Sequence, residues 1–232
     1  MFDRLKKVLG TPGKSETQPS VQPLGPLDPV AQWASGLGFT HEGFGEGKGF
    51  ALSGKVSGKP FKLERGRSSR DYIRGEELRA RGELKVNDDV SVLIMNRPLK
   101  EALEKRAYEM YTDTLQTTAD PSLPEEMRWL AMYPEAGWDG VPEGFWDRYS
   151  VLADQKEQAQ QFVNAQVAEL LMSWPKPAPD DQVPFILMIL RGKSYLRMQY
   201  TPADLPTLQH AMLVFTTASQ AAVAGLSADI TI

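Results

Sequence analysis

The sequence predicts an α+β fold: an antiparallel β meander with flanking helices, followed by a helical segment and then a second β-hairpin with a C-terminal helix. Two observations predict this class. Segments between 39 and 95 alternate apolar and charged residues, as Phe61 to Glu64 does, and turn-forming Gly, Ser, Pro, Asn or Asp residues separate them. Apolar residues recur at helical spacing before and after these segments. Strands and helices grouped in separate runs are typical of α+β proteins.

Residues 1–27 are expected to form a flexible N-terminal arm and linker. Residues 10–27 are rich in Gly, Pro and polar residues, which offer little surface to bury. Residues 1–9 combine apolar and basic side chains at helical spacing, but a helix this short is marginal without a partner. We therefore expect either a docking arm or a frayed terminus. The candidate docking residues are Phe2, Leu5, Val8 and Leu9.

A compact body is expected over residues 28–232, beginning with a helix. Asp28 suits the N-cap and Pro29 the first helical position. Five meander strands are expected at 39–44, 49–56, 61–67, 77–86 and 90–95. Because a helix that opens at Pro98 carries apolar residues along one side, we expect it to cover the apolar face of the meander.

The second half is expected to be helical before its hairpin. Ser122, followed three residues later by Glu125, is a capping signature that predicts a helix up to Tyr133. A Gly- and Pro-rich loop over 135–144 comes next. The remaining expected elements are a long helix over 145–174, a hairpin of strands 183–190 and 195–200, and a helix over 203–224.

The body is compatible with one core or with two lobes, at about 28–118 and 119–232. Both halves contain two strands followed by a helix, and similar Gly-Lys turns lead into strands at 58–61 and 192–195. Such turns also arise from turn chemistry alone. The sequence therefore leaves a diverged repeat and a single core as alternatives.

Composition excludes several classes of function. With 41% hydrophobic and 24% charged residues, the chain has the usage of an ordinary globular protein. A net charge of −4 disfavours a protein that binds nucleic acid over its whole surface. The chain has no cysteine, which excludes disulfides and thiolate chemistry and fits a cytoplasmic location. The longest apolar run, 185–190, is too short to cross a bilayer, and no export signal is visible.

No familiar catalytic, metal-binding or nucleotide-binding motif is present. The two histidines, His41 and His210, lie far apart in sequence, so we do not expect a histidine-based metal site or nucleophile. The alternating glycines of 43–49 lack the dinucleotide fingerprint, and 54–60 lacks the spacing of a phosphate-binding loop. We therefore assign no catalytic residue, no metal ligand and no cofactor.

A cluster of arginines over 65–81 is the densest group of one charge. Guanidinium groups suit phosphate or carboxylate recognition, so the cluster is a candidate anion-binding site. Glutamates and aspartates are interleaved with it, and opposite charges on a solvated strand pair across the ladder, which is the structural alternative. The candidate residues are Arg65, Arg67, Arg70, Arg74, Arg79 and Arg81.

Acidic residues and tryptophans gather between 125 and 147. Two carboxylates beside an aromatic platform could cleave a sugar, whereas acidic residues near helix starts also stabilise those helices. Tryptophans commonly serve as core or interface anchors. The residues concerned are Glu125, Glu126, Glu135, Asp139, Glu143 and Asp147, with Trp129, Trp138 and Trp146.

Two function hypotheses follow. The first is a non-enzymatic binding or adaptor protein that docks on a larger assembly, through its N-terminal arm or its body surface, and has a protein partner. Docking on a membrane surface is the weaker version, because few apolar residues are available. The alternative is a small anionic-ligand binder or an enzyme that uses the 65–81 arginines or the acidic, tryptophan-rich loops.

Overall fold

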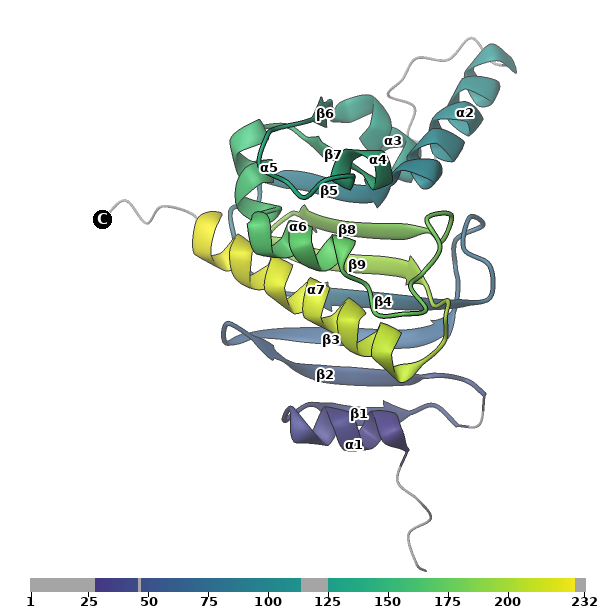
Figure 1. The fold of residues 1–232 in the computed structure, drawn as a ribbon, viewed down its shortest axis with the longest axis vertical. Coiled ribbons are helices and arrows are strands. Elements are labelled where there is room, and N and C mark those ends of the chain that lie inside the picture. The colour runs from purple at the N-terminus through teal and green to yellow at the C-terminus, as the bar shows by residue number, and fades with distance from the viewer. Residues whose placement is uncertain (1–27, 46, 114–124, 228–232) are drawn as a thin grey trace, which may run out of the picture.

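A computed structural model of the protein describes residues 28–45, 47–113 and 125–227. Their strands form one antiparallel sheet with the order β1-β2-β3-β4-β9-β8-β5-β7-β6 (Figure 1). The strands are β1 (Thr40–Gly43), β2 (Phe50–Val56), β3 (Lys59–Arg67), β4 (Glu76–Gly82), β5 (Ser91–Asn96), β6 (Glu135–Ala136), β7 (Tyr149–Ala153), β8 (Phe185–Leu190) and β9 (Lys193–Gln199). The helices are α1 (Pro29–Gly36), α2 (Arg97–Asp113), α3 (Glu125–Met132), α4 (Phe145–Arg148), α5 (Lys156–Phe162), α6 (Ala165–Met172) and α7 (Leu205–Gly225). The α+β class predicted from the sequence is confirmed.

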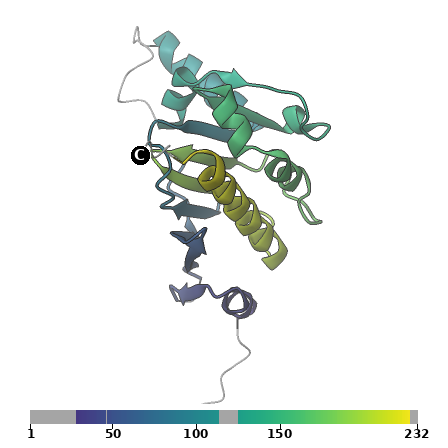
Figure 2. The same cartoon turned by 90° about the vertical axis from the view of Figure 1, so that its left-hand side faces the viewer.

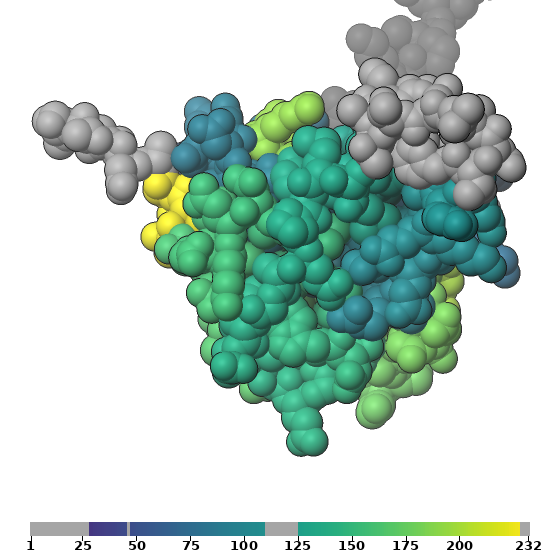
Figure 3. Space-filling view, turned by 90° about the horizontal axis from the view of Figure 1, so that it is seen from above, coloured from purple at the N-terminus to yellow at the C-terminus, as the bar shows by residue number. Residues whose placement is uncertain are grey.

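The helices are divided unequally between the two faces of the sheet. Helices α1, α5, α6 and α7 lie on one face, where the larger hydrophobic core forms (Figure 2). On the other face, α2 and α3 pack over β5, β7 and β8 in a smaller core that includes Leu93, Leu99, Trp129 and Met188. Figure 3 shows from above the end of the molecule at which α2 and α3 lie. The segments from α2 to α6 form most of this end.

Strand composition follows this division. All residues of β5 and β7 are buried, and so are those of β8 except Leu190, because helices cover both faces there. Strand β9 instead alternates, with Leu196 and Met198 buried and Tyr195 and Arg197 half-buried. Continuous apolar runs are typical of strands covered on both faces, and alternation is typical of strands covered on one.

Segments from both halves of the chain share this sheet. Strand β9 pairs with β4, and β8 pairs with β5, so the later hairpin lies between two strands of the earlier half. The segments 28–118 and 119–232, offered as lobes by the sequence, therefore do not form separate sheets among the described residues.

The prediction of a single long helix over 145–174 is wrong. The structure has a short helix α4, the strand β7, and then helices α5 and α6. A short apolar run buried on both sides cannot be distinguished from a buried helical segment by periodicity alone. The side chain of Asn164 accepts a hydrogen bond from Val167 N at 3.0 Å and so caps a separate helix α6.

The expectation that the helix opening near Pro98 covers the apolar face of the meander is also wrong. Helix α7 covers that face, and the ring centroids of Phe61 on β3 and Phe215 on α7 lie 6.1 Å apart. Helix α2 packs over β5 on the opposite face instead. An amphipathic pattern shows that a helix has an apolar side but not which surface that side meets.

Candidate binding surface on the open face of the sheet

No helix in the described part of the chain covers the face of β3, β4 and β9 that points away from α7. We call this surface the open face. Directly opposite residues of antiparallel strands point to the same side, so the register defines two rows of side chains that continue onto β8. The first row is Lys62, Arg81, Tyr195 and Met188, and the second row is Glu64, Arg79, Arg197 and Ile186.

The open face is hollowed into a shallow cavity of about 360 Å³. Four cationic side chains line it: Lys62, Arg79, Arg81 and Arg197. Among the described residues that line this cavity, Glu64 is the only one with a carboxylate. The cavity is therefore basic, although the net charge of the whole chain is −4.

Like charges face each other across the strands of this cavity. Lys62 lies opposite Arg81, and Arg79 lies opposite Arg197. Like charges placed directly opposite are unfavourable, so a sheet built only for stability gains nothing from these pairings. Glu64 offsets part of the repulsion, because its carboxylate oxygens lie 2.7 Å from Lys62 Nζ and 3.0 Å from Arg79 Nε.

The carboxylate of Glu64 is held in its charged form. Its hydrogen bond with Lys62 is the largest influence and lowers its pKa, with Arg79 acting in the same direction and partial burial opposing both. The same hydrogen bond raises the pKa of Lys62. Both groups therefore carry full charge at neutral pH, and one carboxylate faces several cations.

The other cations of the cavity have partners at its margin. Arg81 Nη2 lies 2.5 Å from Glu83 Oε1, and Arg197 Nε lies 3.2 Å from the buried Glu77 Oε1. The side chain of Arg81 remains 55% exposed and that of Lys62 51% exposed. Exposed ion pairs are weak, so Lys62 and Arg81 can exchange partners with an incoming anion at little cost, whereas the buried Glu77 holds Arg197 in place.

A second cavity of about 200 Å³ adjoins the first and shares Met188, Tyr195 and Arg197 with it. It lies where the open face meets α3, and its apolar lining also includes Trp129, Ile186 and Leu190. The charged residues of its lining are Arg70, Glu125, Glu126, Arg191 and Arg197. The two cavities thus meet along β9 and β8.

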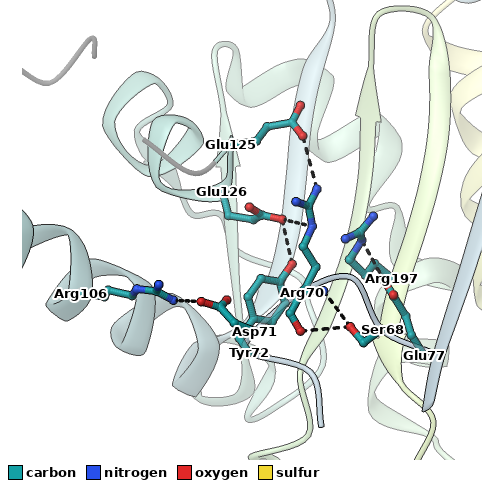
Figure 4. A network of polar contacts seen from close by, with 9 residues as sticks. All are labelled: Ser68, Arg70, Asp71, Tyr72, Glu77, Arg106, Glu125, Glu126 and Arg197. Atoms are coloured by element: carbon teal, nitrogen blue, oxygen red, sulfur yellow. Dashed lines mark hydrogen bonds and ion pairs between the residues drawn. The ribbon is translucent and has the colours of Figure 1, made fainter. Parts of the chain in front are cut away.

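A polar network around the buried Glu126 holds the wall of the second cavity (Figure 4). Glu126 on α3 accepts a hydrogen bond from Tyr72 Oη at 3.0 Å, and its Oε1 lies 2.8 Å from Arg70 Nε. Burial, and secondarily the Glu126 carboxylate, raise the pKa of Tyr72, so this phenol stays protonated and donates. Asp71 pairs with Arg106 of α2. The segment between β3 and β4 is therefore tied to both α2 and α3.

The six arginines predicted as a candidate anion site are not brought together. Arg65 lies among side chains of the helix-covered face, where its guanidinium stands 5.6 Å from the Tyr200 ring and pairs with Glu76 at 2.7 Å. Arg70 belongs to the network just described. Arg67 and Arg74 are exposed. Of the six, Arg79 and Arg81 line the basic cavity.

The acidic, tryptophan-rich region is tightly packed. Trp129 is buried in the smaller core. Trp138 and Trp146 pack edge to face with centroids 5.0 Å apart, and Trp146 Nε1 donates to Trp138 O at 3.2 Å. Glu135 pairs with Arg97 at 2.9 Å. These contacts favour structural roles, and the sugar-cleaving pair stays a prediction.

The two histidines lie apart from this surface. His210 packs on Trp174, with ring centroids 4.6 Å apart, and burial lowers its pKa. His41 lies 3.7 Å from Asp28, the residue that caps α1. The docking residues predicted in the arm, Phe2, Leu5, Val8 and Leu9, fall outside the described residues.

Within the described residues, no group of three or more His, Asp or Glu side chains could hold a metal ion. Of the helices in these segments, none is both long and apolar enough to cross a bilayer.

Comparison with known proteins gives no family for this chain: no family model matches it, and neither do the curated proteins or the solved structures searched.

Sequence reasoning missed much of this surface: Lys62 and Glu64 on β3, and Tyr195 and Arg197 on β9. The signal that could have found them is strand alternation. Tyr195 and Arg197 alternate with the apolar Leu196 and Met198, which places them on the polar side of a half-buried strand.

Proposed function

We propose that this protein is a non-enzymatic binding protein, an adaptor whose open face takes an acidic segment of a protein partner. The observation that carries this proposal is the juxtaposition of four cations in the basic cavity, two pairs of them directly opposite across the strands. The cytoplasmic location expected from the cysteine-free sequence and docking through the N-terminal arm remain part of the proposal.

Shape favours a protein segment as the occupant. The basic cavity is shallow and open, and it continues into the neighbouring second cavity, so an extended chain can lie across both. Complementary charge steers such an encounter and fixes its orientation more than it raises affinity. Micromolar binding that weakens with salt is therefore the expected behaviour.

A small anionic ligand is the alternative function. Its support is the same set of cations around a single cavity of about 360 Å³, within the usual size range of small-molecule sites. This alternative predicts that inorganic phosphate or citrate binds as tightly as an acidic peptide. The proposed function predicts that the peptide binds far more tightly.

Binding of acidic peptides to the full-length protein tests the proposal. We expect a fluorescently labelled glutamate-rich peptide to bind in an anisotropy titration and a lysine-rich peptide of equal length not to bind. The Arg81→Glu variant should weaken binding about tenfold or more, because it turns an exposed cavity cation into an anion. Added salt should weaken binding of the natural protein more than that of the variant.

The matched control is Lys156→Glu. Lys156 is an exposed cation in the first turn of α5, on the helix-covered face, and a negative charge is favourable there. This variant makes the same change of net charge and should bind the peptide almost like the natural protein. Equal loss in the two variants would show that net charge, and not the open face, governs binding.

A further inference from the structure

Both rows of the open face change character along their length. Each row has charged side chains on β3 and β4 and ends in an apolar side chain on β8, Met188 in one row and Ile186 in the other. Because α3 stands beside β8, this apolar end is also the floor of the second cavity. The surface is therefore polarised across the strands, basic at β3 and β4 and apolar at β8.

The spacing of the strands sets the distance between the two ends. Neighbouring strands lie about 4.8 Å apart, so two spacings separate β8 from β4 and three separate it from β3. These distances are about 10 Å and about 14 Å. An extended peptide advances about 3.3 Å per residue and would cover them in about three and about four residues.

Resting on the proposed function, we infer that the partner segment is bipartite. It carries one large apolar or aromatic residue, which enters the cavity beside Trp129 and Leu190. About three to four residues away it carries two acidic residues, which meet Arg79 and Arg81. The segment lies across the strands, because both rows run in that direction.

Charged side chains also line the second cavity. Its carboxylates, Glu125 and Glu126, are paired with Arg70, and the cations Arg191 and Arg197 complete its charged lining. An apolar side chain that contacts Trp129 and Leu190 gains from removal of its surface from water. These two side chains therefore define the contact that the apolar residue of the segment makes.

Three labelled peptides test the inference with the full-length protein by fluorescence anisotropy. The first has phenylalanine about three residues before two glutamates, with prolines as the spacer. The second replaces the phenylalanine by serine. The third has the composition of the first but moves the phenylalanine about nine prolines away, too far for a stiff spacer to bridge the cavities. We expect the first to bind about tenfold more tightly than the other two.

Protein variants locate the effect. Leu190→Ala should weaken binding of the first peptide and leave the second unchanged, because only the first places an apolar side chain against Leu190. Arg81→Gln, at a half-exposed position, should weaken binding of both. Circular dichroism during urea unfolding checks that each variant is folded.

The outcomes separate the two proposals. Equal affinity of all three peptides would overturn the bipartite inference and leave the proposed function in place. An unchanged affinity of the first peptide in Leu190→Ala would overturn the assignment of its phenylalanine to the second cavity. If none of the three binds, the proposed function fails, and the inference fails with it.

Discussion

Replacing Phe215 by alanine should lower the free energy of unfolding by about 3–5 kcal/mol. Phe215 lies on α7, is fully buried and packs against Phe61 of β3. Removing its ring would leave a cavity between α7 and the meander, because the surrounding side chains relax only partly. Urea unfolding followed by circular dichroism measures this change.

Leu213→Ala is the control on the same helix. Leu213 is 48% exposed, so its truncation should change the free energy of unfolding by about 0.5 kcal/mol or less. Equal losses for the two variants would contradict the placement of α7, since the residue two positions from Phe215 would then be equally buried.

Removing the Glu126 carboxylate should produce the second large loss. Glu126→Ala should lower the free energy of unfolding by about 2 kcal/mol. The reason is that Tyr72 and Arg70 would lose their shared partner beside the smaller core. We expect less than the loss for a fully buried pair, because 31% of the Arg70 side chain is exposed and water can solvate it.

Two variants at neighbouring positions distinguish the charge of the Glu126 carboxylate from its hydrogen bond with Tyr72, and Glu126 from its neighbour Glu125. Glu126→Gln keeps an oxygen that can accept from Tyr72, so its loss should be smaller than that of Glu126→Ala. Glu125→Ala should have little effect, because Glu125 is 41% exposed and lies 3.6 Å from Arg70. The network in Figure 4 would be contradicted if Glu125→Ala proved as harmful as Glu126→Ala.

The elements that the sequence predicted well are those with a clear period and clear ends. Asp28 caps α1, as its position before Pro29 predicts, and the hairpin of β8 and β9 lies at the expected place. Alternation predicted that β3 and β4 are half-buried, which the structure confirms. These signals depend on neighbours along the chain.

What the sequence could not predict depends on residues far apart along the chain. Pairing of β4 with β9 joins segments more than a hundred positions apart, and no local pattern encodes it. The opposition of Arg79 and Arg197 follows from that pairing and from its register. The partnership of Arg70 with Glu126 likewise depends on where α3 packs. The basic cavity is therefore a product of topology.

Part of the arginine cluster could have been resolved from alternation alone. Arg65 has the same parity as Phe61 and Leu63, which places it on their side of β3. Arg79 and Arg81 alternate with Leu78 and Ala80, which places them on the opposite side from the apolar residues. The arginine cluster was defined by position along the chain, and it therefore combined residues that point to opposite faces of the sheet.

The most direct test of the open face as the binding surface is an NMR titration of the isotope-labelled full-length protein with the glutamate-rich peptide. We predict that shifts concentrate at the amides and side chains of Lys62, Arg79, Arg81 and Arg197. Arg81→Glu should abolish these shifts and Lys156→Glu should preserve them. Shifts concentrated on α5 and α7, or spread evenly over all exposed cations, would contradict the account.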